Sequence, residues 1–347
     1  MSGERICVVG PEHRVAIIGA ILARRWSGDG RELLLAPNCE ASDRETIIAR
    51  PDHVRVHAEL GLPPDMLVQN AGAVPVLAVK VDSAAGSLTL PFSPFGMARF
   101  GVEFHHFWQR ADASKCQPDL TEFSLALALE HAADRPSLAA LSKLPLQNGL
   151  RLDRAKYSAL LMKAAVSNGA RVVAEPSTED LTIDCGSNGK GSEWAGGLLS
   201  VATDSDVPGL DWQICVNAAR RLLGLVPHLS DCENERREYT RLAAEEAGRI
   251  ADMRALLTDP DPGNTASHAL KRKIDVFTAC GRIPTEDFEV FGQPEWLAAL
   301  WGRGLRPRRF DRMAKAMPED DLHRWLSSLR SQIVEITNQV SRQRQVA

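Results

Sequence analysis

The first 36 residues carry a strand, helix, strand pattern. A β-branched run over 5–9 leads into a Gly-Pro-Glu break, an apolar segment follows over 15–26, and a second apolar run spans 32–36. The middle segment has helical length and ends near two arginines, cations that suit the negative end of a helix dipole. A βαβ unit of this kind predicts a parallel sheet.

The hydrophobic period changes near Val216. Before it, short extended runs alternate with helical patterns; after it, apolar residues recur at helical spacing. The strands predicted before the change are 74–81, 86–91, 171–174, 181–185 and 198–202, and the helices are 50–62, 121–133 and 154–168. The helices predicted after it are 216–225, 233–258, 266–280, 294–301 and 319–340. The pattern predicts an α/β fold, with a degenerate Rossmann-like sheet domain of the FAD/NAD(P)-binding type over 1–212 and an α-helical C-terminal region over 213–347.

The composition is that of a globular chain and argues against several classes of protein. Apolar residues make up 44% and charged residues 25% of the 347, and Lys plus Arg (41) nearly balance Asp plus Glu (45), so we expect no nucleic-acid partner. No apolar stretch approaches the ~20 residues that cross a bilayer, and no secretory signal pattern is present, so we expect no membrane partner and a cytoplasmic location. The seven cysteines contain no CxxC pair, which argues against zinc and against a disulfide framework.

The turn after the first predicted strand is where Rossmann-like folds bind a dinucleotide. The G-x-G-x-x-G pattern found there lets the backbone approach the diphosphate closely. Only Gly10 of the three glycines is present; Glu12 places a carboxylate at the second position and Val15 fills the third. The second strand also ends without an acidic residue for a ribose. We therefore expect no cofactor, with Gly10 as a vestige of the binding turn.

Other motifs that could support catalysis or binding are weak. Gly189-Lys190 lies in a polar turn that lacks the P-loop spacing. His105 and His106 are adjacent and flanked by aromatic residues, and neighbouring residues on a strand point to opposite faces, so we interpret them as part of an aromatic packing strip. We expect no metal site.

Five segments, taken in order, resemble the flavin-dependent tryptophan halogenases. They correspond to the family's FAD-binding turn and helix (10–24), the helix after its flavin-contacting strap (50–62), the catalytic-lysine segment (70–81, NAGAVPVLAVKV), the Pro/Phe/Gly strip (91–108, PFSPFGMARFGVEFHHFW) and the C-terminal helical end (277–311). The resemblance covers most of the chain and suggests a shortened, degenerate member. It implies the halogenase fold, and FAD as the cofactor of active members.

The departures fall on the residues that the resemblance makes catalytic. In the family, a lysine captures hypohalous acid formed at the flavin and delivers the halogen to the substrate ring. Its position falls on Val76, and Lys80 stands where the family has arginine. The assisting glutamate is missing, its position lying near Pro208, and only Trp212 stands where the family has W-x-W-x-I-P. We therefore expect no catalytic residue.

The leading hypothesis is a non-catalytic halogenase homologue, a pseudoenzyme that acts as partner or regulatory subunit of a full-length, active flavin-dependent halogenase, or pairs with itself. One alternative is an active flavin-dependent halogenase or other oxidoreductase with a rebuilt site, to which the sequence offers Lys80 and the His105-His106 pair. Another is a regulatory module that binds a small molecule. The shortening leads us to expect exposed apolar surface and an obligate oligomer.

Overall fold

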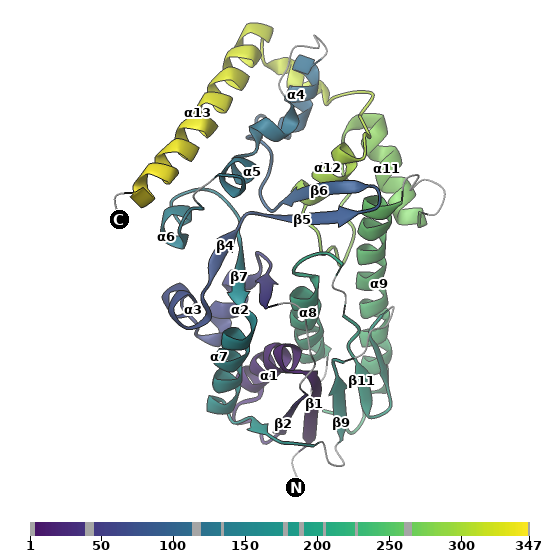
Figure 1. Cartoon of the computed structure of the whole chain (residues 1–347). Coiled ribbons are helices and arrows are strands. Elements are labelled where there is room, and N and C mark those ends of the chain that lie inside the picture. Colours follow the sequence, from purple (N-terminus) through teal and green to yellow (C-terminus); the bar gives the residue numbers. More distant parts are fainter. Residues whose placement is uncertain are drawn as a thin grey trace. The chain divides into compact units, whose positions relative to one another are not determined.

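The computed structural model describes residues 4–38, 45–112, 119–132, 135–175, 180–186, 191–203, 206–225, 228–259 and 266–345. They form two compact units, the first from 1–74 and 149–248 and the second from 75–148 and 249–347 (Figure 1). The units interleave along the sequence, and the expected division between residues 212 and 213 stays a prediction. Within the described part of the chain, no helix is both long and apolar enough to cross a membrane.

A six-stranded sheet is the main sheet of the first unit, with strand order β10-β11-β9-β1-β2-β8. Its strands are β1 (Arg5–Pro11), β2 (Glu32–Asn38), β8 (Arg171–Val172), β9 (Leu181–Asp184), β10 (Glu193–Ala195) and β11 (Leu198–Ser200). Neighbouring strands are parallel, except that β10 runs antiparallel to β11. The predicted α/β class and parallel sheet are confirmed.

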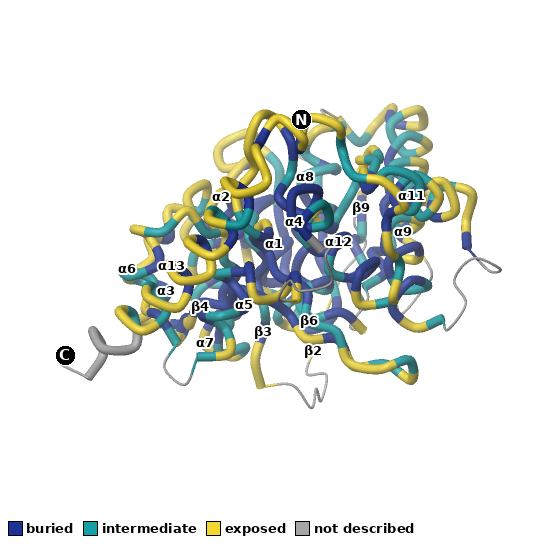
Figure 2. Tube along the Cα trace, turned by 90° about the horizontal axis from the view of Figure 1, so that it is seen from above, coloured by how far each residue is buried: buried dark blue, intermediate teal, exposed yellow. Residues whose placement is uncertain are grey.

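Helix α1 (Glu12–Trp26) packs on this sheet through a continuous apolar stretch. All residues from Val15 to Leu22 are buried, and most of α1 is dark blue in Figure 2. The burial is this complete because α1 contacts β1 and β2 as well as the helices α7 (Arg154–Ser167) and α8 (Leu210–Leu225). At Gly19 the helix approaches β2 closely, since an added Cβ would lie 2.6 Å from a methyl carbon of Leu35.

The first unit also holds elements that the sequence pattern did not indicate. These are α3 (Pro64–Ala71), β3 (Thr46–Ala49) and β7 (Gly149–Asp153), the last two forming an antiparallel pair. Helix α2 (His53–Leu60) lies within the helix predicted over 50–62, and Gly61, in a left-handed conformation, caps its C-terminus. Helix α9 (Glu233–Thr258) has the predicted bounds and runs from the first unit's residues into the second's. Helix α8 begins six residues earlier than predicted.

The second unit combines one hairpin with helices. The hairpin strands are β5 (Ala78–Ser83) and β6 (Gly86–Pro91), and the sequence boundary between the units, after residue 74, falls within β4 (Val74–Val76). The helices are α4 (Phe104–Asp112), η1 (Leu120–Phe123), α5 (Leu125–Glu130), α6 (Leu138–Leu141), α11 (His268–Cys280), α12 (Gln293–Gly302), η2 (Arg312–Ala316) and α13 (Glu319–Gln345). α13 packs on α4, η1 and α5, while α12 packs on β6. This agrees with the predicted helical C-terminal region.

One predicted helix is broken. The segment expected as a single helix over 121–133 forms η1 and α5, separated at Ser124. Ser124 has extended backbone angles, and its hydroxyl accepts a hydrogen bond from the Leu127 backbone N–H. Serine favours such N-terminal caps, so it starts a new helix instead of continuing the old one.

Candidate functional site

The start of α1 has the features of an anion-binding helix N-terminus. The helix begins directly after Pro11, which makes no side-chain capping hydrogen bond. The first backbone N–H groups of a helix have no partner within it, and the positive end of the helix dipole attracts anions. Arg14 adds a guanidinium to this first turn, while Glu12 is exposed beside it. The turn therefore offers donors that suit a diphosphate, while its own Glu12 carboxylate opposes an anion.

Gly10 is required where the end of β1 packs against the segment after β9. Its φ of +134° is one that residues with a side chain rarely adopt. An added Cβ would lie 2.8 Å from the backbone nitrogen of Gly186 and 2.9 Å from Sγ of Cys185. The glycine thus lets the end of β1 meet the segment after β9, and its expected role as a vestigial cofactor residue stays a prediction.

An ion cluster joins the N-termini of α1 and α8. The Asp211 carboxylate, in the first turn of α8, lies 2.8 Å from Nε2 of His13 and 3.0 Å from Nε of Arg14. Arg14 also donates a hydrogen bond to the carbonyl of Cys185, 3.0 Å away. Arg14 is buried, so these contacts hold its charge at the start of α1.

The position that the resemblance gives to the catalytic lysine is apolar and enclosed. Val76, at the end of β4, is 1% exposed. Lys80, the amine nearest to it in sequence, lies in β5 with 64% of its side chain exposed, and its Nζ is 3.1 Å from the carboxylate of Asp82 on the same strand. Lys80 is therefore exposed to solvent on strand β5 and paired with an acid.

A hollow of about 580 Å³ opens in the second unit among β6, η1, α5 and α12. Phe95 and Trp301 give it aromatic surface, and the Arg306 guanidinium carbon lies 3.9 Å from the ring centroid of Trp301. Glu122 and His131 add polar groups. Such a mixture suits a planar aromatic ligand with a polar substituent. None of the described residues that line it is lysine or cysteine.

The aromatic strip around His105 forms a helix rather than a strand. In α4, Phe107 and Trp108 are buried, with ring centroids 5.4 Å from Trp325 and 5.0 Å from Trp301, respectively. The expected aromatic packing is present, but the assumption of strand geometry was wrong. The physical reason is that a short apolar aromatic run does not by itself distinguish a strand from a buried helix.

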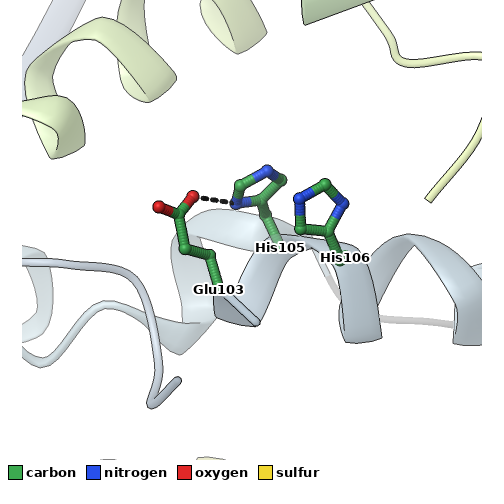
Figure 3. Close-up of side chains that lie close together, drawn as sticks. All are labelled: Glu103, His105 and His106. Atoms are coloured by element: carbon green, nitrogen blue, oxygen red, sulfur yellow. Dashed lines mark ion pairs between the residues drawn. The ribbon is translucent and has the colours of Figure 1, made fainter. Parts of the chain in front are cut away.

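Because the segment is helical, two histidines and a glutamate come together (Figure 3). His105 Nδ1 lies 3.6 Å from a Glu103 carboxylate oxygen, and the ring centroids of His105 and His106 are 4.2 Å apart. Burial lowers the pKa of both histidines, that of His106 to about 4. Both rings are therefore neutral near pH 7.

A match to one family model covers most of the chain. A tryptophan halogenase model matches residues 46–187 and 210–319, more than half of the chain. The chain belongs to the tryptophan halogenase family. The match is interrupted over 188–209, which overlaps the segment where the resemblance places the absent tryptophan motif. Among the curated proteins, none matches this tryptophan halogenase homologue.

Solved structures similar to this family member include several flavin-dependent halogenases. BrvH from Brevundimonas sp. BAL3 matches with a TM-score of 0.81 at 18% identity, over 96% of either chain. Xcc4156 from Xanthomonas campestris matches with 0.81 at 15% identity, over 98% of this chain and 96% of that one. The tryptophan 6-halogenase SttH from Streptomyces toxytricini matches with 0.75 at 10% identity, over 96% of this chain and 97% of that one. At these identities the likeness shows a shared fold.

The expectation that the protein has no cofactor was wrong. It is overturned by the family assignment and by the similarity in fold to flavin-dependent halogenases. The glycine pattern misled because other positions of this chain perform the structural roles of the two missing glycines. Gly19 supplies the close helix–sheet packing expected of a third glycine, and the start of α1 keeps the backbone donors of an anion site. Loss of two motif glycines therefore does not exclude FAD.

Two features of the site lay beyond the sequence pattern. Asp211 was not singled out, because nothing local marks an acid that binds residues so distant in the sequence. Trp301 and Arg306 were also missed as a pair, although their spacing at the end of a predicted helix was visible. A basic residue shortly after a terminal aromatic is the signal that would have indicated them.

Proposed function

We propose that this tryptophan halogenase homologue does not itself transfer halogen and acts as a partner subunit of an active flavin-dependent halogenase. The observation that carries the proposal is the buried Val76 at the position that the resemblance gives to the catalytic lysine. A valine side chain has neither a lone pair to capture hypohalous acid nor a proton to donate. A chain that keeps the family fold but lacks this amine is suited to be a partner subunit that does not catalyse the reaction.

The neighbouring amine does not replace the missing one. Lys80 is largely exposed and paired with Asp82, so its ammonium is held in solvent. Amines that act as nucleophiles in enzymes are activated by an enclosed site or by an adjacent group, and an exposed amine paired with an acid has neither. This supports the absence of lysine-dependent halogen transfer within the chain.

The proposal retains flavin binding. The backbone N–H groups at the start of α1, together with Arg14, are the groups that would hold the diphosphate of FAD. When bound, FAD supplies the redox chemistry of the family. A partner subunit that binds flavin keeps the first unit folded around its cofactor, and its surface stays available to the active subunit.

An active halogenase with a rebuilt site is the second candidate. It is favoured by the aromatic hollow around Trp301 and by the early start of α8. Because α8 begins at Leu210, Asp206 provides a carboxylate just before this helix, close to where the resemblance puts the assisting glutamate. In this case the hollow takes a planar aromatic substrate.

The two candidate functions predict different products when the purified chain is assayed without a second halogenase. The chain is incubated with FAD, a flavin reductase, NADH, halide and indole, beside a heat-killed control. We expect no halogenated indole from the wild-type chain. Product above the heat-killed control favours the second candidate and contradicts the first.

A pair of lysine substitutions then tests the role of Val76. Val76→Lys puts an amine at the enclosed position, and Val54→Lys puts one at a position that is 63% exposed. Product from Val76→Lys but not from Val54→Lys supports the missing amine as the cause of inactivity. Circular dichroism of both variants checks that each is folded.

A further inference from the structure

We propose that Glu103, His105 and His106 form a binding site for one divalent first-row transition-metal ion, with Zn²⁺ as the reference ion. Their candidate ligand atoms, one carboxylate oxygen and two imidazole nitrogens, all lie within 4.8 Å of one another (Figure 3). Imidazole nitrogen and carboxylate oxygen are ligands that Zn²⁺ and its neighbours in the series accept. The site differs in residues and chemistry from the flavin and halogen-transfer positions.

Helix geometry is what assembles the three side chains. Glu103 directly precedes α4, and His105 and His106 are the second and third residues of its first turn. On a strand, adjacent histidines would point to opposite faces. Here their ring planes are tilted by only 34°, and the Glu103 carboxylate lies beside His105. The convergence therefore follows from the fold of residues 103–106.

The tautomer of His105 directs a lone pair at Glu103. Its Nε2 lies 2.7 Å from the carbonyl oxygen of Gly281, and because a carbonyl only accepts, Nε2 carries the proton. In the neutral ring, Nδ1 then presents its lone pair to the Glu103 oxygen 3.6 Å away. Two electron-pair donors thus face each other, and a cation bound by both relieves their repulsion.

The hydrogen bond from His105 to Gly281 is of the kind that orients histidines bound to metal ions. Histidines that bind metals usually donate their other ring N–H to a carbonyl or carboxylate, which fixes the ring and its tautomer. Gly281 performs this for His105, and it also packs on His106, since an added Cβ would lie 2.7 Å from Cε1 of that ring. Both histidines are buried and held in place before any ion binds.

His106 can bind the ion in exchange for one hydrogen bond of its ring. Its Nδ1 accepts from the backbone N–H of Asp311 at 3.2 Å. Coordination of an ion replaces this hydrogen bond.

A hollow of about 320 Å³ gives the site access and room for water ligands. It is lined by Glu103 and His106 together with Arg282, Gln293 and Asp311. Arg282 lies 2.9 Å from the Asp311 carboxylate, which offsets its charge, and Gln293 donates to the second oxygen of Glu103. Two of the three proposed ligands, Glu103 and His106, thus border an open volume in which water can complete the coordination.

The test is a metal titration of the full-length chain after chelator treatment. Isothermal titration with Zn²⁺ measures stoichiometry and affinity, and the visible absorption of added Co²⁺ reports nitrogen and oxygen ligation directly. The ligand variants are Glu103→Gln and His106→Gln; the control is His268→Gln, an exposed histidine of α11. Circular dichroism confirms that each variant is folded.

We expect one Zn²⁺ per wild-type chain, an affinity at least about tenfold weaker in Glu103→Gln and in His106→Gln, and no change in His268→Gln. The Co²⁺ absorption bands should be lost in the two ligand variants only. Absence of saturable binding by the wild-type chain overturns the proposal, as does equal binding by the wild-type chain and both ligand variants.

Discussion

The indole nitrogen of Trp212 donates a hydrogen bond to the phenol oxygen of Tyr157, 3.2 Å away. Tyr157 in turn lies 2.8 Å from Nε2 of His57, and since its single proton is not needed for the bond from Trp212, it donates to His57. All three side chains are buried, and they join α8, α7 and α2 within the first unit. Trp212, the one tryptophan in the segment where the resemblance expects a motif, thus stabilises the sheet unit.

Loss of this hydrogen bond should lower the stability of the first unit. Trp212→Phe removes the indole donor and should lower the free energy of unfolding by about 1 kcal/mol. Trp212→Ala also leaves a cavity and should cost about 3–5 kcal/mol. Urea denaturation followed by circular dichroism measures both. Equal midpoints for the wild-type chain and Trp212→Ala would contradict the assigned packing role.

His57 should make the stability depend on pH. Burial, and to a lesser extent the neighbouring His53, lower its pKa from 6.5 to about 3. Between these values the unfolded chain binds a proton that the folded chain does not. The contribution of His57 to the free energy of unfolding is therefore full above pH 6.5 and falls as the pH drops towards 3, by up to about 1.4 kcal/mol per pH unit.

A variant isolates the contribution of this one histidine. His57→Gln keeps an acceptor for Tyr157 but does not titrate, so the slope of unfolding free energy against pH should flatten between pH 6 and 4. His268→Gln, an exposed control, should keep the wild-type slope. The same slope in His57→Gln and the wild-type chain would assign the effect to other groups.

A buried ion pair in the second unit should be costly to break and less costly to replace. Lys273 is 2% exposed, its Nζ lies 2.6 Å from the Glu289 carboxylate, and it stands 3.8 Å from the ring centroid of Trp296. Lys273→Met leaves the carboxylate without this partner and should cost about 3–5 kcal/mol. The double variant Lys273→Met with Glu289→Gln should lose less. Urea denaturation of the wild-type chain, Lys273→Met, Glu289→Gln and the double variant measures the coupling between the two residues. Additive losses in the free energy of unfolding would refute this coupling.

The carboxylate of Glu12 should weaken flavin binding. It sits in the first turn of α1, where the helix dipole favours an anionic ligand. Glu12→Gln should tighten FAD binding about 2–5-fold. Glu235→Gln, which removes an acid from the first turn of α9, serves as the control and should change nothing. Fluorescence titration with FAD decides, and weaker binding by Glu12→Gln would place the diphosphate elsewhere.

The sequence could predict elements with a strong period and short-range signals. The βαβ unit follows from its apolar runs, and α9 from a long stretch between clear breaks. The pairing of β3 with β7 could not be predicted, because residues about a hundred positions apart form it and neither run is long. Strand geometry at His105 was the wrong choice between two readings of a short aromatic run.

The candidate site was harder to predict than the fold, for a physical reason. The loss of two glycines at the first turn was visible, but the compensating close approach at Gly19 depends on which side chain of β2 faces it. The pairing of His13 and Arg14 with Asp211 depends on the meeting of two helix N-termini. Such relationships are set by tertiary packing, which local residue patterns do not contain.

The role as partner subunit is tested most directly by affinity purification of the full chain from its native host, with the stoichiometry of the eluate determined by mass spectrometry. We predict a full-length flavin-dependent halogenase at a one-to-one ratio with this chain. Recovery of this chain alone, as a single stable species that halogenates indole without a second protein, would contradict the proposal.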